Sequence, residues 1–413
     1  MKEEEKVVLI IATLDTKGEE TLYLRDRIRA LGCRALVLDI SMRDGPHCRE
    51  ADIPAREVAA AGGSSIEEVQ ASKERSATTA VMTRGAIAIA KGLSAEGRVH
   101  GVIGIGGSTG SLMATDVMRA LPFGLPKLMV SSTAALPGMS TRYIGTGDIC
   151  LFHSVVEISG LGGVLKNVIE RAAEAICAMV DVPPLEAMKG RSRGPSIAMT
   201  MLGPCERCAS RVRRGLEGLG LQVTGFSAAG VGDRAMEEMV RQGIFDGVVD
   251  LAPGGVIEHL VGGMRDAGPR RLEAAGEMGI PQVVSTCGVN HITPPKKAWT
   301  EDHKSRRKYD LDRHRTWLRA SREELLEAAR AFATKLNKAK GPVKVLIPLQ
   351  GWSSVDQPGS PTFDPTEDMV FVEELKRGLR PEIEVRTVEA NMEDPEFAQA
   401  VLEACREVFP IPD

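Results

Sequence analysis

The sequence has no excess of charge of either sign, no hydrophobic run of membrane-spanning length and no dense cysteine pattern. The formal net charge is -4 in 413 residues, too small to create a field that gathers polyanions such as nucleic acids. The first apolar run, 7–12, is too short for a membrane span or a secretory signal, and the residues before it are acidic. The eight cysteines are scattered, as expected for reduced thiols. These absences predict a cytoplasmic protein with neither nucleic-acid nor membrane partners.

The length and composition favour two globular α/β domains. Hydrophobic residues make up 43% of the sequence, which is ample for burial. A chain of 413 residues is too long for one ordinary core. Short β-branched runs alternate with longer helical stretches, and the runs are continuously apolar, which is typical of parallel strands covered on both faces. We place a first domain at 1–185, a linker rich in proline, glycine and charge at 186–194, and a second domain at 195–413.

The expected strands follow from these apolar runs. In the first half they are "VVLIIAT", "ALVLDI", "GVIGIG" and "KLMVSS", with a further short strand near "RYIGTGDI". In the second half they are "SIAMTML", "QVTGFS", "GVVDLA", "PQVVST", "VKVLIPL" and "EVRTVEA". The segment 294–315 has no periodicity and is long for a plain connection, so we predict a functional loop or flap there.

The stretch "GIGGSTGS" follows a buried strand and opens a helix. It is not a Walker loop, because it has no lysine, and it is not a dinucleotide fingerprint, because the third glycine comes one place late. Ser108 or Thr109 could cap the helix, whose free N–H groups suit an anion. One interpretation is a phosphate site, and the other is that the glycines only permit a sharp turn. The candidate phosphate-binding residues are Gly104, Gly106, Gly107, Ser108, Thr109 and Gly110.

Two more loops follow expected strands of the first half. "ATLDTKGEE" offers Asp15, Thr16 and Lys17, where the lysine could neutralise a phosphate and Asp15 could hold Mg²⁺. The hydroxyl- and glycine-rich stretch 131–149 adds Ser132, Thr133, Gly145 and Thr146 as nucleotide-binding candidates, and Asp148 as a second metal candidate. The alternative for each loop is an ordinary helix cap or turn.

Candidates for chemistry in the second half lie in "PLQGWSSVDQPGSPTFDP" and near 291. Ser353, Asp356 and Asp364 could face a ligand at the strand ends, and Asp356 or His291 could act as acid or base. Turn formation is the alternative, because proline, glycine and aspartate are common turn residues. Cys205 and Cys208 form a lone C-x-x-C without further zinc ligands nearby, which favours buried thiols and leaves a redox role open.

The order of the motifs "IIATLDTKGEE", "GVIGIGGSTGS", "KLMVSST" and "YIGTGDI", followed by "GPRRLEAAGEMGIPQVV" and "PLQGWSSVDQPGSPTFDP", covers nearly the whole chain. In this order the chain resembles the uncharacterised family that includes the ATP-binding domain of the tomato mosaic virus resistance protein. The resemblance implies two Rossmann-like domains, each a mainly parallel sheet flanked by helices. It also implies ATP binding and self-association, which we expect to give a homodimer.

Three functional hypotheses follow. The first is an ATP-binding protein with an interdomain cleft, acting with Mg²⁺ as an ATP-dependent enzyme on an unidentified small molecule. The second is an ATP-regulated binding module without turnover. The third is an NAD(P)-dependent oxidoreductase, against which the displaced third glycine argues.

Overall fold

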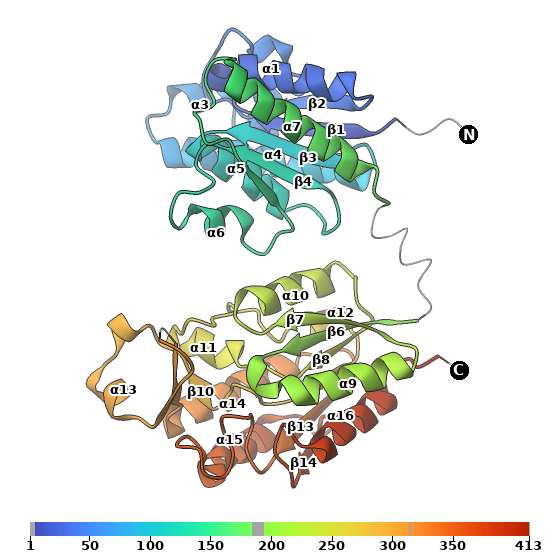
Figure 1. Cartoon of the computed structure of the whole chain (residues 1–413), viewed down its shortest axis with the longest axis vertical. Coiled ribbons are helices and arrows are strands. Elements are labelled where there is room, and N and C mark those ends of the chain that lie inside the picture. Colours follow the sequence, from blue (N-terminus) through green and yellow to red (C-terminus); the bar gives the residue numbers. More distant parts are fainter. Residues whose placement is uncertain (1–4, 184–193, 314, 413) are drawn as a thin grey trace. The chain divides into compact units, whose positions relative to one another are not determined.

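The computed structural model describes residues 5–183, 194–313 and 315–412, and the chain forms two compact units, Met1–Ser192 and Arg193–Asp413. Apart from Gly194, the predicted linker lies outside the described residues. Each unit has a parallel main sheet flanked by helices (Figure 1). The predicted fold class, two Rossmann-like α/β domains, is therefore confirmed.

The N-terminal unit is built around a five-stranded parallel sheet in the order β2-β1-β3-β4-β5. Its strands are β1 (Val7–Ala12), β2 (Arg34–Asp39), β3 (Gly101–Gly106), β4 (Lys127–Ser131) and β5 (Cys150–His153). Its helices are α1 (Leu14–Ala30), η1 (Cys48–Glu50), α2 (Ala55–Ala61), α3 (Ile66–Ala71), α4 (Arg75–Ala95), α5 (Ser108–Arg119), α6 (Met139–Ile144) and α7 (Gly163–Val180).

The continuous apolar character of the central strands reflects burial on both faces. Every residue of β1, β3 and β4 is buried. Alternate residues of β1 supply two separate cores: Val8 and Ile10 pack with α1 and α7, whereas Leu9 and Ile11 pack with α2, α4 and α5. This two-sided packing explains why these strands lack the polar alternation of a half-exposed sheet.

The sequence expectation differs from the structure around 142–149. The predicted short strand near "RYIGTGDI" is present but shifted, because Arg142–Ile144 complete α6 and the strand begins at Cys150, directly after this stretch. Tertiary contacts of Tyr143 favour the helical conformation here. Its side chain is fully buried, and its hydroxyl forms a hydrogen bond with the Thr133 hydroxyl at 2.6 Å. The tertiary contact overrides a local preference for strand.

The C-terminal unit has a six-stranded parallel sheet in the order β14-β13-β9-β8-β6-β7. Its strands are β6 (Ser196–Met201), β7 (Gln222–Ser227), β8 (Gly247–Asp250), β9 (Gln282–Val284), β13 (Val343–Pro348) and β14 (Glu384–Val388). The helices packed on it are η2 (Gly203–Cys205), α9 (Glu206–Gly218), α10 (Val231–Arg241), α11 (Gly255–Val261), α12 (Ala274–Met278), α14 (Arg322–Leu336), α15 (Pro365–Gly378) and α16 (Pro395–Val408).

The two faces of this sheet are covered by different helices. Ile197 and Met199 of β6 pack with α9 and α16, and Ala198 between them packs with α10 and α12 (Figure 1). The helix that covers β13 has a clear start signal, because Ser321 and Glu324 form a reciprocal capping box at α14. None of the described helices of either unit is long and apolar enough to cross a membrane.

The segment 294–315, predicted as a functional loop or flap, has secondary structure of its own. It contains η3 (Lys296–Ala298), α13 (Glu301–Ser305) and β11 (Lys308–Asp310). β11 pairs antiparallel with β12 (Thr316–Arg319), which also pairs with β10 (His291–Ile292) to make a small three-stranded sheet. The segment is therefore more regular than its sequence indicates, because its pairing strand lies just beyond it at 316–319. Its role as a functional loop or flap stays a prediction.

A buried ion cluster holds α10, β8 and the segment before α12 together. The Arg271 side chain is fully buried and makes two hydrogen bonds to the Asp250 carboxylate, at 2.5 and 2.8 Å. Its other contacts are to Asp233 and Glu237, both at 3.1 Å. Burial raises the pKa of Asp233 and of Glu237, and the Arg271 charge opposes both shifts. One guanidinium thus compensates three carboxylates in the unit's interior.

Replacing Arg271 tests this cluster. Arg271→Ala should lower the free energy of unfolding by about 3–5 kcal/mol, because buried carboxylates lose their counter-charge. Without Arg271 the pKa values of Asp233 and Glu237 rise further. A carboxyl whose folded pKa is raised costs stability as pH rises, so the loss should be larger at about pH 8 than at about pH 5. Urea unfolding at both pH values measures it.

The matched control is Arg270→Ala. Arg270 is the preceding residue, and its side chain is 61% exposed and pairs with Glu277 at the surface. An exposed pair contributes little, so this variant should unfold like the wild type. Equal effects of the two substitutions would contradict the role assigned to the buried cluster.

Candidate functional site

A cavity of about 650 Å³ opens beyond the carboxyl ends of β1 and β3. These two strands are neighbours in the 2-1-3-4-5 order, and the connections that follow them lead to helices on opposite faces of the sheet. Such a switch point leaves a crevice where ligands bind in open α/β sheets. The cavity is lined by 13–17 after β1, by 107–110 after β3, and by residues of 42–43 and 69–78.

The first turn of α5 lines this cavity without a side-chain cap. The N-cap is Gly107, not Ser108 or Thr109 as predicted, and it makes no side-chain capping hydrogen bond. The first helical hydrogen bond runs from the Ser111 N–H to the Gly107 carbonyl at 2.8 Å. The amides of 108–110 precede this bond, so they lack helical acceptors and carry the positive end of the helix dipole.

The glycines of "GIGGSTG" divide into two groups. A Cβ at Gly104 would lie 2.5 Å from the Met129 sulfur, and a Cβ at Gly106 would lie 3.2 Å from the Gly110 Cα. Neither residue lines the cavity, so the structure gives them a packing role instead of the predicted place in a phosphate loop. Gly107 differs, because the nearest atom to an added Cβ is the Ser132 hydroxyl at 4.0 Å.

The loop after β1 contributes side chains and few free amides. The Leu14 N–H donates to the Asp39 carboxylate at 3.1 Å, and the Asp15 N–H donates to the Ser41 hydroxyl at 2.9 Å. Burial raises the pKa of Asp39, which sits at the end of β2. The start of α1 is therefore capped from within the protein. Asp15, Thr16 and Lys17 line the cavity, and the Lys17 ammonium donates to the Ile158 carbonyl at 2.6 Å.

Cations dominate the charged lining. Lys17, Arg43, Lys73 and Arg75 line the cavity, and Asp15 is the one acidic residue in the described lining. The Arg75 guanidinium donates to the Thr109 hydroxyl at 3.2 Å, which connects the start of α4 to the first turn of α5. Sequence reasoning missed the three cations outside the β1 loop. Lys73 and Arg75 in "SKERS" can be read from the sequence, but no local pattern predicts that they lie beside the glycine loop.

The third predicted loop is split between the two edges of the sheet. Ser132 and Thr133 follow β4 and lie at the same carboxyl edge as Gly107. Gly145 and Thr146 follow α6 and lead into β5, and a Cβ at Gly145 would lie 2.7 Å from the Arg119 side chain at the far end of α5. The predicted convergence of all three loops is wrong for these two residues, because α6 carries the chain back to the amino edge.

Asp148 also lies at the amino edge, where it pairs with a buried lysine. The Lys127 ammonium, at the first residue of β4, donates to the Asp148 carboxylate at 2.6 Å, and its side chain is only 1% exposed. Burial lowers the pKa of Lys127, and the Asp148 charge opposes that shift. Asp148, predicted as an alternative to Asp15 for holding a metal ion, instead pairs with Lys127 at the opposite edge of the sheet.

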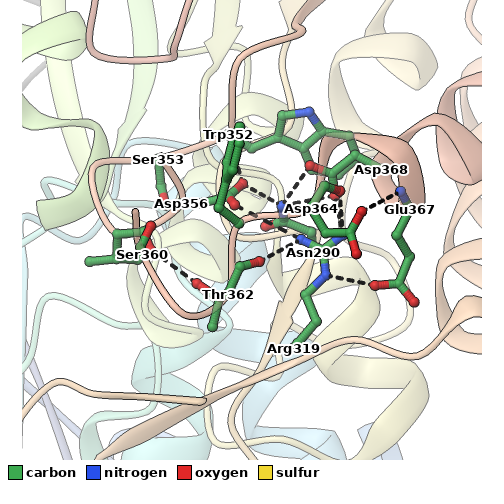
Figure 2. A network of polar contacts seen from close by, with 12 residues as sticks. Asn290, Arg319, Trp352, Ser353, Asp356, Ser360, Thr362, Asp364, Glu367 and Asp368 are labelled. Carbon is green, nitrogen blue, oxygen red and sulfur yellow. Dashed lines mark hydrogen bonds and ion pairs between the residues drawn. The ribbon is translucent and has the colours of Figure 1, made fainter. Parts of the chain in front are cut away.

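In the C-terminal unit, three of the four predicted catalytic residues are buried, and one of them, Asp356, belongs to a polar network. His291, Ser353 and Asp356 have no exposed surface. Figure 2 shows the part of the network in which Asn290 reaches Asp356 and Asp368. The Asn290 amide donates to Asp356 at 2.6 Å and to Asp368 at 3.0 Å, and Arg319 donates to Asp368 at 2.5 Å.

The charges of this network are shifted by burial. Burial raises the pKa of Asp356, and raises that of Asp368 to about 7 although the Arg319 charge opposes it. Burial, with the charges of Arg319 and Arg265, holds the pKa of His291 well below its usual value. The imidazole is therefore neutral at physiological pH.

Asp364 has a different position from the other three. Its carboxylate accepts from the Glu367 N–H at 2.9 Å as the N-cap of α15, and it pairs with Arg307 at 2.9 Å. Asp364 therefore caps the start of α15. Cys205 and Cys208 are buried free thiols, and burial raises the pKa of Cys208, which disfavours the thiolate form of that residue.

Comparison with known protein families covers both units. The N-terminal domain model of the uncharacterised protein family UPF0261 matches residues 6–184, and the C-terminal domain model matches residues 194–409. The chain belongs to the UPF0261 family. A UPF0261 protein of Clostridium tetani is 37% identical over 96% of this chain and 97% of its own length.

The family includes the tomato protein whose resemblance was noted from the motifs. The ToMV resistance protein Tm-1(GCR237) of Solanum lycopersicum is 30% identical over 98% of this chain and 56% of its own length. The resemblance is therefore confirmed. Among solved structures, a putative UDP-N-acetylglucosamine 2-epimerase from Listeria monocytogenes matches with 14% identity and a TM-score of 0.23, covering 68% of this UPF0261 chain and 79% of that chain. A TM-score of this size supports no conclusion about function.

The structural role of Asp148 is testable. Asp148→Asn should lower the free energy of unfolding at neutral pH by about 1–2 kcal/mol, because the buried Lys127 ammonium loses its partner while the partly exposed carboxylate contributes less than a buried one. Burial lowers the pKa of Lys127, so the loss should shrink as the pH rises into the alkaline range and Lys127 gives up its proton. Chemical unfolding at neutral and alkaline pH measures this. A variant as stable as the wild type would return Asp148 to the candidate metal ligands.

Proposed function

We propose that the N-terminal unit binds the phosphate groups of ATP, with Mg²⁺, in the cavity beyond β1 and β3. The observation that supports this most strongly is the uncapped start of α5, whose first turn lines a cavity with four cationic side chains and one acid. Amides at a helix start and neighbouring cations are what an oligophosphate requires.

Two other helix starts are less suited to an anion than the start of α5. The start of α1 is capped by Asp39 and Ser41. In the C-terminal unit, the amides of Arg207 and Cys208 at the start of α9 donate to the Glu393 carboxylate, at 3.1 and 3.2 Å. A carboxylate already in place repels a phosphate, so α5 is the better anion site. A volume of about 650 Å³ also falls within the range of small-molecule and cofactor sites.

The residues have separate roles. The amides of 108–110 hold phosphate oxygens, and Lys17, Arg43, Lys73 and Arg75 neutralise their charge. Gly107 keeps the approach to these amides open.

Asp15 fits a magnesium ion that is shared with the phosphates. Its carboxylate accepts from the Thr16 hydroxyl at 3.2 Å, and both residues line the cavity. Mg²⁺ at nucleotide sites is commonly held by one or two carboxylates, phosphate oxygens and water, so one acid is sufficient. The described residues contain no group of three or more metal-ligating side chains, which points away from an all-protein cage. When bound, Mg²⁺ would neutralise phosphate charge.

The choice of ATP among phosphate-bearing ligands rests on the resemblance to the family of the tomato protein's ATP-binding domain. The proposed role is that of an ATP-dependent enzyme acting on a small molecule, with an ATP-regulated binding module as the alternative. Both roles require the same nucleotide site.

A valine at Gly107 tests the site directly. The backbone there has φ -77° and ψ -164°, which valine adopts without strain, and an added Cβ meets nothing closer than 4.0 Å. Gly107→Val should therefore fold normally but cover the helix amides, weakening ATP·Mg²⁺ binding at least about tenfold by calorimetry.

The matched control is Gly162→Val. Gly162 is also an uncapped N-cap in an extended conformation, at the start of α7, has open space around it and does not line the cavity. This variant should bind ATP like the wild type. Thermal-shift measurements with ATP, ADP, NAD and NADP complete the test. Stabilisation by NAD but not by ATP, or unchanged binding in Gly107→Val, would refute the proposal.

Turnover separates the two roles. Incubation with ATP, Mg²⁺ and candidate small molecules should release phosphate or AMP from the wild type and not from Gly107→Val. Binding that is retained without release across a broad panel would favour the regulated module.

A further inference from the structure

Unpartnered polar atoms gather at the carboxyl end of the C-terminal sheet. Within the described residues, the buried atoms without a hydrogen-bond partner include Ser353 Oγ, Asp356 Oδ1, Asn290 Oδ1, both ring nitrogens of His291, and Arg265 Nη1. Ser353 and Asp356 follow β13, and Asn290 and His291 follow the adjacent strand β9. The ends of parallel strands are where ligands bind in open α/β sheets.

These atoms lie in two groups that the consecutive residues Asn290 and His291 join along the chain. Asp356 accepts from Asn290 at 2.6 Å and from the Trp352 N–H at 2.9 Å through Oδ2, which leaves Oδ1 without a bond. The Asp356 N–H donates to the Ser353 carbonyl at 3.1 Å, so the two residues form a tight turn (Figure 2). Arg265 donates to the His291 carbonyl at 3.1 Å.

A cluster of this kind is costly unless something pairs with it. Each unsatisfied buried polar group costs about 1–3 kcal/mol, and natural proteins keep few of them. The ionic groups, in contrast, are paired: Arg265 with Glu258 at 2.6 Å and Arg319 with Asp368 at 2.5 Å. What is left to satisfy is therefore a set of polar atoms, not an uncompensated charge.

The unpaired atoms define the chemistry of a partner. Asn290 Oδ1 and Asp356 Oδ1 need donors, Arg265 Nη1 needs an acceptor, and the Ser353 hydroxyl and the neutral His291 ring can do either. Hydroxyl groups donate and accept, and an uncharged molecule leaves the existing ion pairs undisturbed. The rings of Trp317 and Trp352, both almost fully buried, border the same cluster, and the Arg265 guanidinium lies over the Trp317 ring.

We propose that the C-terminal unit has a second ligand site, formed by Asn290, His291, Ser353, Asp356 and Arg265, that binds a small neutral polyhydroxylated molecule, a sugar or polyol. The segment 349–364 covers this site. Residues 351–353 of this segment are buried and residues 357–359 are exposed. The positive φ angles of Gly351 and Gly359, +101° and +91°, mark turns in it. The ligand enters when this segment lifts. The site does not depend on nucleotide binding in the N-terminal unit.

Tryptophan fluorescence reports on this site, because two of the three tryptophans of the chain border it. The full-length protein is titrated with ribose, xylose, glucose, galactose, mannose, erythritol and myo-inositol at millimolar concentration, with acetate as an anionic comparison. At least one neutral compound should give a saturable change. Ser353→Ala should weaken that binding about tenfold, the equivalent of one hydrogen bond.

The matched control is Ser354→Ala, in the next residue of the same segment, which should bind like the wild type. General stabilisation by sugars affects all variants equally, so a difference between these two serines identifies a specific site. Without ligand, Ser353→Ala should melt at the same or a higher temperature, because it removes an unpaired buried hydroxyl.

Three results would overturn the proposal. The first is the absence of a saturable response to every neutral compound in the panel. The second is equal binding by Ser353→Ala and Ser354→Ala. The third is a lower melting temperature of unliganded Ser353→Ala than of Ser354→Ala, which would mean that the hydroxyl is satisfied by internal water in a purely structural network. ATP binding measured on the same variants distinguishes this failure from failure of the nucleotide site.

Discussion

The placement of β1 between β2 and β3 is the constraint on which the N-terminal site depends. Parallel strands need crossover helices, and the order 2-1-3-4-5 sends the connections after β1 and β3 to opposite faces of the sheet. The loops at these two strand ends therefore separate, and the first turns of α1 and α5 border one crevice. The same geometry keeps Asp148 and Gly145 away, because residues that lead into a strand lie at the other edge.

Within that geometry, the electrostatics of the helix starts decide what the crevice can hold. Asp39 and Glu393 supply internal carboxylates to the starts of α1 and α9. The start of α5 has no such partner, and the cations of α4 and of the β2 connection lie beside it. An internal carboxylate and a phosphate would compete for the same amides, so the start of α5 is more open to an anion than the starts of α1 and α9.

The C-terminal unit uses buried charge in two ways. Around Arg271 the guanidinium and its three carboxylates are bonded to one another, which ties together segments far apart in sequence. Around Asn290 and Asp356 the charged groups also have partners, but individual polar atoms are left without a hydrogen bond. The first arrangement is complete within the protein, whereas the second leaves bonding capacity unused.

The sequence by itself determined the fold class and the position of most strands, because these depend on local patterns such as apolar runs and capping residues. The glycines at a strand end predicted a ligand role for the loop at Gly107. The sequence did not determine which loops meet. Strand order and packing, which no short motif encodes, bring Arg43, Lys73 and Arg75 to the cavity. The same constraints place Gly104, Gly145 and Asp148 elsewhere. The burial of His291 and Asp356 also depends on tertiary structure, because their surroundings include Arg319, Asp368 and Arg265, which come from other segments of the chain.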